Sequence, residues 1–467
     1  MKMWSGRFRQ PLNAEFERWQ RSFGFDRRLL QYELAASAAH ATALKNAGIL
    51  SANELIGILQ GLEQIGKQSE GSLAFFEDDE AEDVHHFVEK QLVALIGELG
   101  YKLHSGRSRN EQIATDLRLF VRAAIDQLRE ELAKLGSAIV DRAEQAGDAA
   151  IPAYTHLQRA EPILVGHWLL AYVEMFLRDA DRLADCRKRL NLCPLGSGAV
   201  AGATLPLDRT LMADKLGFDA PTANSMDATS DRDFAIEFVQ ALSLLALHLS
   251  RWAEEMILFS SQEYGFIELP EAYSTGSSAM PQKKNPDLLE LVRGKSGRII
   301  GNATALMISV KGLPLAYNKD LQETQEPLFD SADALLQMLP LVTGWMKVVE
   351  FHLEAMQKAA NSGFMNAWAA ATYLVNQDIP SRIAHERIGK VVQMCMERNC
   401  ELKDLSLQEL RSLSPAFGED FKQSLTLNSV LAVHDVPGGT APSRVRQAIG
   451  AARKKIESLR EEVHAHA

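Results

Sequence analysis

The feature that most constrains the fold is a run of apolar residues at helical spacing that is far longer than an average helix. The apolar positions are spaced by three or four over more than 25 residues, at Ile113, Leu117, Phe120, Ala124, Leu128, Leu132, Leu135 and Ile139. This spacing places them on one face of an α-helix. Because the mean helix of a globular protein has only about 11 residues, the segment predicts a bundle of long helices.

Four further segments show the same helical character, and we expect all five to pack together. The expected long helices cover residues 109–145, 162–190, 232–260, 288–310 and 327–360, the last kinked at Pro340. The 30 glycines and 16 prolines make up about 10% of the 467 residues, against roughly 12% in average proteins, which also favours helices. The predicted class is all-α in three domains, namely a mixed helical domain at 1–106, the long-helix bundle at 107–361 and a small helical domain at 362–467.

Residues 238–250 contain no Asp, Glu, Lys or Arg. A helix that is apolar nearly all round is expected to be buried. One chain cannot hide this much apolar surface, so we expect the long helices to form the shared core of a homotetramer. Polar residues interrupt the most apolar helix, and the N-terminus lacks an apolar run of signal-peptide length. We therefore expect no membrane span and a cytoplasmic protein.

The formal net charge of −11 argues against a nucleic-acid-binding surface, so local basic clusters are expected to mark sites for small anions. The cysteine spacing matches no zinc or redox pattern, which predicts reduced thiols and no metal site. The four cysteines are Cys186, Cys193, Cys395 and Cys400. His85 and His86 are poor candidates for one metal ion, because adjacent residues diverge on a helix.

Residues 104–110, His-Ser-Gly-Arg-Ser-Arg-Asn, place two arginines and several small residues at the start of the first long helix. Free backbone N–H groups at a helix start favour an anion, with Ser108 as a candidate cap. Arg107 or Arg109 could bind a carboxylate through two hydrogen bonds, and Asn110 follows in the first turn. The alternative is an ordinary helix start with solvated arginines.

Residues 274–287 read Ser-Thr-Gly-Ser-Ser-Ala-Met-Pro-Gln-Lys-Lys-Asn-Pro-Asp. Gly276 gives the backbone the freedom to carry the hydroxyl of Ser277 towards and away from a ligand. Lys283 and Asn285 place a cation and an amide near that hydroxyl, which suits an anionic substrate. Glycine- and serine-rich stretches are often plain connectors, but a connector has no need of the remaining residues.

This loop resembles the signature of the fumarase/aspartase superfamily, Gly-Ser-Ser-x-Met-Pro followed by a lysine and Asn-Pro. The Gln-Lys-Lys variant resembles the argininosuccinate lyase family. The resemblance extends over nearly the whole chain, and it implies a cofactor-free lyase. Its further motifs are Trp4–Phe8, Ser22 with Phe25–Arg27, Gly-Arg-Ser-Arg-Asn at 106–110, Thr-His-x-Gln-x-Ala at 155–160, Tyr317–Glu323 and Gly438–Pro442.

By this resemblance the reaction is the reversible β-elimination of argininosuccinate to fumarate and arginine. A base must remove a proton beside a carboxylate, and cations and N–H donors placed there lower the barrier. The family pattern makes Ser277 the base and places Lys283 and Asn285 at the developing charge. His156, oriented by Glu290, would protonate the departing nitrogen or manage the proton of the serine.

The same resemblance implies the substrate contacts. Thr155, Asn110 and Ser22 are expected at the carboxylates, with Tyr317 and Gln322 nearer the arginine end. Two positions depart from the family, since many members carry lysine at the position of Gln325 and glutamine at that of Glu161. Three of these segments, Thr155–His156, Gly106–Asn110 and Ser274–Asp287, lie at ends of long helices. A single bundle could hold these ends far apart, so we expect different chains to supply the residues of each active site.

Two alternatives remain open. A related enzyme such as an adenylosuccinate lyase would share Ser277 and the fold, but that branch usually lacks the Gln-Lys-Lys and Tyr-Asn-Lys-Asp-Leu-Gln sequences. A catalytically silent helical scaffold has precedent in lens crystallins that resemble this family. The presence of Ser277, Lys283, His156 and Glu290 together argues against a silent scaffold.

Overall fold

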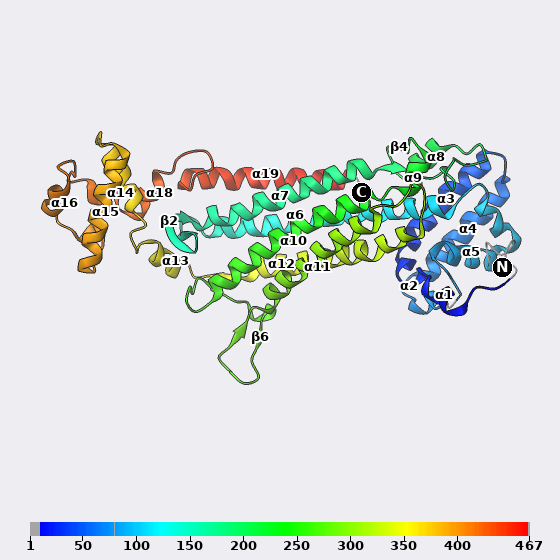
Figure 1. Ribbon diagram of the computed structural model, residues 1–467, viewed down its shortest axis with the longest axis horizontal. Helices are drawn as coiled ribbons and strands as arrows, with labels where there is room; N and C mark the ends of the chain where they lie inside the picture. Colours follow the sequence, from blue (N-terminus) through cyan, green and yellow to red (C-terminus); the bar gives the residue numbers. More distant parts are fainter. Residues whose placement is uncertain (1–9, 79, 466–467) are drawn as a thin grey trace. The chain divides into compact units, whose positions relative to one another are not determined.

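The structure is a computed structural model that describes residues 10–78 and 80–465, so the Trp4–Phe8 motif lies outside the described residues. Helices dominate, with a few short strands, and the all-α prediction is confirmed (Figure 1). The chain divides into two compact units, each built from three segments. The first unit is Met1–Gln127, Arg182–Ser243 and Arg298–Ala334, and the second is Leu128–Asp181, Leu244–Gly297 and Leu335–Ala467. The three-domain division stays a prediction.

The N-terminal part of the first unit consists of helices, some of which begin at polar side chains that cap them. Ser51 and Glu54 form a reciprocal capping box at the start of one helix. Asp83 caps another, accepting a hydrogen bond from His86 N at 2.8 Å. These elements are α1 (Ala14–Trp19), α2 (Phe23–Asp26), η1 (Arg27–Leu29), α3 (Leu30–Asn46), α4 (Ala52–Ser69), η2 (Leu73–Phe76), α5 (Val84–Ile96) and η3 (Gly97–His104).

Five long helices follow, and each contributes one part to each unit. They are α6 (Arg109–Gln145), α7 (Val165–Leu190), α10 (Asp233–Ser260), α11 (Asp287–Val310) and α12 (Gln325–Val348). The expected helix at 327–360 is wrong in its extent. The chain stays helical through Pro340, ends α12 at Val348 and forms a separate α13 (Leu353–Ala360). Strand pairing of β8 (Glu350–Phe351) with β5 (Ile267–Glu268) interrupts the helix there.

The expected start of α7 at 162 is also wrong, because residues 158–164 belong to a hairpin. Strands β1 (Ala150–Thr155) and β2 (Gln158–Leu164) pair antiparallel, with an irregularity between Pro152 and Tyr154. The remaining short elements are β3 (Leu192–Cys193) paired with β4 (Ala220–Pro221), β6 (Thr275–Gly276) paired with β7 (Lys284–Asn285), α8 (Arg209–Lys215), α9 (Ser225–Ser230), η4 (Glu271–Tyr273) and η5 (Lys319–Thr324).

The C-terminal part of the second unit has its own apolar cluster, which includes Leu374, Phe417 and Phe421. Its helices are α14 (Ala367–Val375), α15 (Ser381–Arg398), η6 (Leu402–Asp404), α16 (Leu407–Leu413), α17 (Phe421–Ser424), α18 (Leu427–Ala432) and α19 (Pro442–His464). The motif at 438–442 predicts that α19 begins with a Thr cap and an early proline; the proline is confirmed, but the Thr cap is wrong. Ala441 is the N-cap residue, because the Thr440 hydroxyl instead accepts a hydrogen bond from Leu164 N at 2.8 Å.

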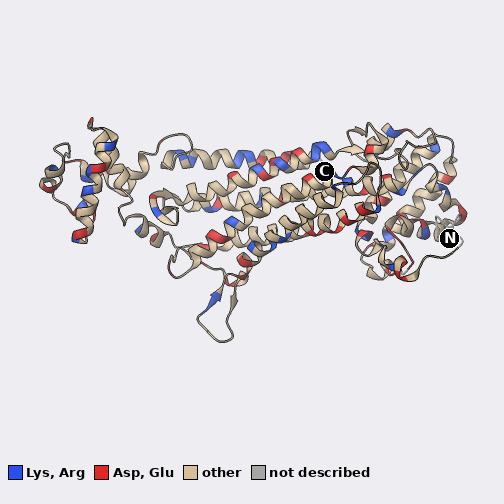
Figure 2. Ribbon diagram, viewed as in Figure 1, with Lys and Arg blue, Asp and Glu red and all other residues tan. Residues whose placement is uncertain are grey.

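Helix α10 is the one helix of the described residues that is long and apolar enough to cross a membrane, by length and composition only. Half of its most apolar 18-residue window is buried. Figure 2 shows few charged residues along α10, whereas α19 carries many. Several large apolar side chains of the long helices stay exposed, namely Leu244, Leu247, Ile300, Met307, Ile308 and Leu341. The single chain therefore leaves an apolar helical surface uncovered.

Candidate active site

The predicted site residues fall in both units. Ser22, residues 107–110, Tyr317 and Gln322 belong to the first unit. Thr155, His156, the loop at 274–287 and Glu290 belong to the second.

Ser22 is buried at the start of α2, where its hydroxyl donates to Asp26 Oδ2 at 2.5 Å. The other carboxylate oxygen of Asp26 accepts a hydrogen bond from Val84 N at 3.0 Å. Burial, and then the charge of Asp83, raise the pKa of Asp26 to about 7. Asp26 is thus a buried carboxyl that titrates near neutral pH and fixes the direction of the Ser22 hydroxyl.

Arg107 faces the interior. Its Nη1 donates to Ser37 Oγ at 2.9 Å, and its Nη2 lies 3.7 Å from Glu33 Oε1. The side chain is only 4% exposed. A second buried contact reaches the same carboxylate, since His85 Nδ1 lies 2.8 Å from Glu33 Oε2. The guanidinium of Arg107 therefore ties the segment before α6 to α3 in this state.

The start of α6 is held by Glu111, whose Oε1 accepts from Ser108 N and whose Oε2 accepts from Gly198 N, both at 3.0 Å. Gly198 has φ +61°, and a Cβ there would lie 2.8 Å from Gly202 O, so only glycine fits without strain. Asn110 Nδ2 donates to the Ala199 carbonyl at 3.2 Å. The glycine-rich link after β3 is thereby docked onto the helix start.

Arg109, the first residue of α6, pairs with two carboxylates. Its Nη1 lies 3.2 Å from Glu82 Oε2 and 3.0 Å from Asp83 Oδ2. Arg107 and Arg109, the two arginines of the predicted anion site, thus both have carboxylate partners within the chain. The Ser108 hydroxyl accepts a hydrogen bond from Asn110 N at 3.3 Å, so N–H groups of this helix start are also bound within the chain.

Tyr317 lies just before η5, and Gln322 lies within it. Gln322 Nε2 donates to the Gln20 carbonyl at 3.2 Å, which brings η5 to the segment before α2. Burial raises the pKa of the Tyr317 phenol, while the nearby Arg232 guanidinium opposes the rise. Gln325 is buried at the start of α12, and its Oε1 has no hydrogen-bond partner among the residues the structure describes.

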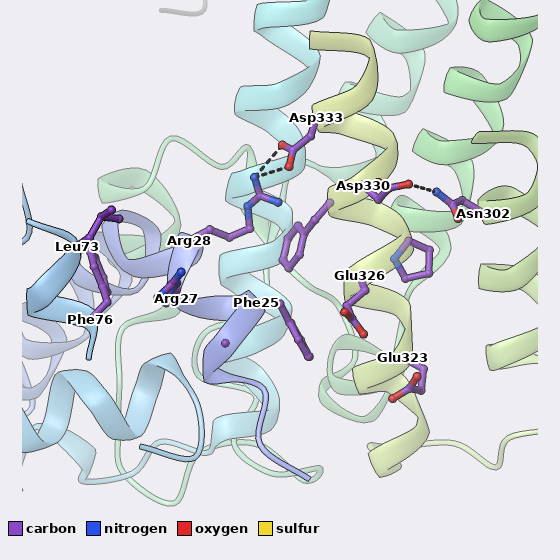
Figure 3. A pocket seen from close by; sticks show the side chains of 13 residues that line it. Phe25, Arg27, Arg28, Leu73, Phe76, Asn302, Glu323, Glu326, Asp330 and Asp333 are labelled. Atoms are coloured by element: carbon purple, nitrogen blue, oxygen red, sulfur yellow. Dashed lines mark hydrogen bonds and ion pairs between the residues drawn. The ribbon is translucent and has the colours of Figure 1, made fainter. Parts of the chain in front are cut away.

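Beside these segments lies an open cavity of about 820 Å³ (Figure 3). Arg28 crosses it to Asp333, with Nη2–Oδ1 and Nη2–Oδ2 distances of 2.7 and 2.9 Å. The carboxylates of Glu323 and Glu326 also line it, next to Phe25. None of the predicted site residues is in its described lining, so it neighbours the candidate site without containing it.

In the second unit, Thr155 and His156 stand at the tip of the β1–β2 hairpin. His156 and Leu157 have φ values of +55° and +57°, a left-handed pair that usually requires Asn or Gly. Thr155 pairs in register with Gln158 across this turn. His156 is exposed. Strain of this kind, on the order of 1–2 kcal/mol for each residue, persists at functional turns.

The loop at 274–287 is a small hairpin closed by β6 and β7, where Thr275 pairs with Asn285 and Gly276 with Lys284. At its turn the Ser277 hydroxyl oxygen accepts hydrogen bonds from Ala279 N at 3.2 Å and Met280 N at 3.1 Å. Two N–H donors aimed at one hydroxyl oxygen favour its anionic form. The family resemblance implies that N–H groups of the loop stabilise the serine alkoxide, but the sequence does not identify which N–H groups these are.

The two lysines of this loop differ. Lys284 Nζ is held by the Glu268 carboxylate and by the Leu269 carbonyl at 3.1 Å. Lys283 is exposed and has no side-chain partner in the described part of the chain. Asn285 Nδ2 lies 3.4 Å from the Gly276 carbonyl. Among the described residues, Lys283 is therefore the cation of this loop that no side chain binds.

Glu290 lies in the first turn of α11, exposed, with Oε1 3.9 Å from Arg293 Nη2. Within the described residues of this chain no hydrogen bond joins Glu290 to His156. The expected orienting pair is thus not formed between these two residues of one chain.

A buried acidic cluster was missed, because its members come from α3, α5 and α6. Ligand atoms of Glu33, His85 and Asp116 lie within 4.8 Å of one another. The Arg107 cation lies next to Glu33, whose Oε1 is already hydrogen-bonded to Ser37 and Gln112. Burial and Glu33 hold the pKa of Asp116 well above its usual range. A shared proton therefore fits this cluster better than a metal ion.

Long antiparallel helices, with a serine-containing loop and a histidine at separate helix ends, define a lyase of the fumarase/aspartase superfamily. The chain matches the family model described as Lyase over residues 6–301, and the argininosuccinate lyase C-terminal model over residues 364–432. The chain belongs to the argininosuccinate lyase family.

Similar proteins cover the full length. The argininosuccinate lyase of Koribacter versatilis is 58% identical over 467 residues, which is 100% of both chains. That of Acidobacterium capsulatum is 59% identical over 464 residues, covering 98% of this chain and 96% of the relative. Among solved structures, an EDDS lyase in complex with formate superposes with a TM-score of 0.86 at 27% identity, covering 98% of this chain and 93% of that one.

Proposed function

We propose that this protein catalyses the reversible β-elimination of argininosuccinate to fumarate and arginine, with Ser277 as the base and no cofactor. The observation that carries this is the pair of N–H donors on Ser277 Oγ, from Ala279 and Met280. A serine hydroxyl is too weakly acidic to act as a base unless its alkoxide is stabilised. The loop already supplies two of the donors that such stabilisation needs.

Proton removal beside a carboxylate spreads a second negative charge over that carboxylate. Lys283, the unpaired cation of the same loop, is proposed to stabilise this charge together with the Asn285 amide. Removing one donor of this kind typically costs about 100- to 1000-fold in rate. In this arrangement the loop carries both the base and the groups that stabilise the anion the base creates.

His156 and Thr155 are proposed to meet the substrate from the hairpin tip. His156 handles the proton of the serine or of the departing nitrogen, and Thr155 donates to a carboxylate. The exposure of this tip supports the role, since the side chains of Thr155 and His156 are accessible there. Glu290 of another chain is proposed to orient the imidazole.

Substrate recognition is proposed for the first-unit group. Ser22, Ser108 and Asn110 offer neutral donors to the carboxylates, whereas Tyr317 and Gln322 serve the arginine end. Arg107 and Arg109 are proposed to shape this surface, with Arg109 exchanging part of its pairing with Glu82 and Asp83 for a substrate carboxylate.

The proposed assembly is a cytoplasmic homotetramer with active sites composed from several chains. The exposed apolar side chains of α10, α11 and α12 support it, because a stable soluble monomer rarely leaves so many along one helix bundle. Active sites built from several chains would also explain why no hydrogen bond joins His156 to Glu290 within the described residues of one chain.

Incubation of purified protein with argininosuccinate, followed by detection of fumarate, tests the function. Fumarate from argininosuccinate supports the proposal. Fumarate from adenylosuccinate instead would indicate the related lyase, and no product from either would indicate a silent scaffold.

A further inference from the structure

The carboxylate of Glu33, on α3, is buried and binds only groups of the chain itself. The residue is 1% exposed. Its Oε1 accepts hydrogen bonds from Ser37 Oγ at 2.7 Å and from Gln112 Nε2 at 3.0 Å. Arg107 Nη2 lies 3.7 Å from the same oxygen, and His85 Nδ1 lies 2.8 Å from Oε2. Both oxygens are thus occupied, which excludes Glu33 as a direct substrate ligand in this state.

Two of these partners stand on either side of predicted substrate-binding residues at the start of α6. Arg107 precedes Ser108 and Asn110 in the sequence, and the next partner, Gln112, follows them. Both partners contact Oε1 of Glu33, so a single oxygen atom fixes the two ends of the segment between them. The donors proposed for the substrate carboxylates are therefore held from behind by one buried carboxylate.

The same face of α3 makes further contacts with this part of the chain. Glu33, Ser37 and His40 are spaced by four and three residues, which places them on one side of the helix. Ser37 Oγ accepts a hydrogen bond from Arg107 Nη1 at 2.9 Å. His40 Nε2 lies 3.0 Å from the Ser105 carbonyl oxygen. The segment before α6 is thus built against α3, and Glu33 supplies the charge that opposes the Arg107 cation.

Glu33 is ionised although it is buried. Burial opposes ionisation, but the charges of His85 and Arg107 outweigh it and hold the pKa of this carboxyl below its usual range. A buried ion pair is often no more stabilising than apolar residues of similar volume. Stability alone therefore does not account for a charged network here, whereas the placement of a binding segment does.

We propose that Glu33 is a positioning residue, whose carboxylate fixes the segment 108–110 so that the Asn110 amide meets the succinate half of the substrate. This inference rests on the proposed function and names the support of that same site. Glu33 acts through the segment and touches no substrate. Its loss is expected to weaken ligands of the succinate half and to leave the arginine half, at Tyr317 and Gln322, unaffected.

Calorimetric titration of the full-length protein with each product separates the two halves. Glu33→Gln keeps the size of the side chain but removes the charge that holds Arg107. It is expected to weaken fumarate binding at least about tenfold, because a binding group displaced by about 1 Å loses much of its effect, with arginine binding within about twofold of the wild type. The kcat/KM for argininosuccinate should fall together with the affinity for fumarate.

Glu255→Gln, in the second unit, is the matched control. The Glu255 carboxylate also accepts hydrogen bonds from two side chains, Trp168 Nε1 at 2.7 Å and the Tyr172 hydroxyl, but it does not contact the segment 108–110. This variant should bind both products as the wild type does.

A double variant tests whether Glu33 acts through Asn110. Asn110→Ala removes the supported amide, so adding Glu33→Gln to it should weaken fumarate binding by less than about a further twofold. Residues that act independently would add their separate losses, and additive losses would overturn the proposal.

Equal losses for fumarate and arginine in a folded Glu33→Gln protein, or no loss for either, also overturn it, because a purely structural role does not distinguish the two products. If that variant does not fold, Ser37→Ala decides, since the Ser37 hydroxyl joins Glu33 to Arg107. It should weaken fumarate binding about threefold with arginine binding unchanged, and any other pattern overturns the proposal. Failure of the proposed function is recognised separately, as a wild-type protein that releases no fumarate from argininosuccinate.

Discussion

The hydroxyl oxygen of Ser277 lies 3.1 Å from the backbone nitrogen of Met280, which donates a hydrogen bond to it. Ala279 N donates to the same oxygen at 3.2 Å. The backbone N–H dipoles of this turn already point at the hydroxyl oxygen. They therefore need not reorient when the oxygen becomes negatively charged. The geometry favours the alkoxide before any substrate is present.

Ser277→Ala is expected to lower kcat by at least about 100-fold while leaving argininosuccinate binding nearly unchanged. The serine is needed when the proton moves, so its loss acts on the transition state more than on the ground state. Fumarate release gives kcat, and calorimetry gives affinity. A variant that keeps more than about a tenth of the wild-type kcat, a barrier change of only about 1.4 kcal/mol, would exclude the serine as base.

Lys283→Met is expected to lose both rate and affinity, because its cation attracts the carboxylate before and during reaction. Lys284→Met is the matched control, since Lys284 is already bound to Glu268 and the Leu269 carbonyl. It should retain substrate affinity within about threefold, as expected for a partly exposed pair of small energetic value. Equal losses in the two variants would contradict the assignment of the free cation.

The helices were predictable because their signals are local. Apolar periodicity located α6, since the apolar positions from Ile113 to Ile139 all lie within Arg109–Gln145. The errors came from partners distant in the chain. Thr440 has the sequence context of a helix cap, but its hydroxyl accepts a hydrogen bond from Leu164 N, 276 residues away in the chain. No local pattern indicates that contact.

The site was predictable as a set of motifs but not as a geometry. The motif at 106–110 marked Arg107, but its inward direction depends on Glu33 of another helix, which no spacing rule connects to it. Loop donors to Ser277 follow from a turn conformation that many serine-rich loops do not adopt.

Mixing Ser277→Ala and His156→Asn proteins and allowing subunits to exchange is expected to restore part of the activity. Each inactive chain then supplies the residue that the other lacks. Exchange is verified with differently tagged chains and mass determination of mixed tetramers. Absence of recovered fumarate release after verified exchange would show that one chain supplies both residues.

Leu247→Glu is expected to dissociate the proposed tetramer, because this side chain is 42% exposed on α10 and a charge there opposes burial in an assembly. Leu73→Glu is the control, since Leu73 is 81% exposed in the first unit, outside the long helices. Light scattering gives the mass of each variant. A wild-type protein that is an active monomer at micromolar concentration would refute the tetramer itself.

Asp26 is expected to make stability fall as pH rises from about 4 to about 7, because its pKa is raised in the folded state. The folded chain binds this proton more tightly than the unfolded chain, so its stabilising contribution is complete below pH 4 and lost through pH 7. Asp26→Asn should flatten this slope by at most about 1.4 kcal/mol per pH unit. Urea unfolding at one protein concentration, measured across this pH range for the wild type and for Asp26→Asn, gives the slope.

Each compact unit is assembled from three separated segments, and the last segment of the first unit ends at Ala334. During synthesis, neither unit has all its residues until about 70% of the chain has left the ribosome. The first halves of α6 and α10 emerge before α12 exists, with their apolar faces open to solvent. Nascent chains of this topology are exposed to aggregation for most of their translation, a risk that chaperones relieve.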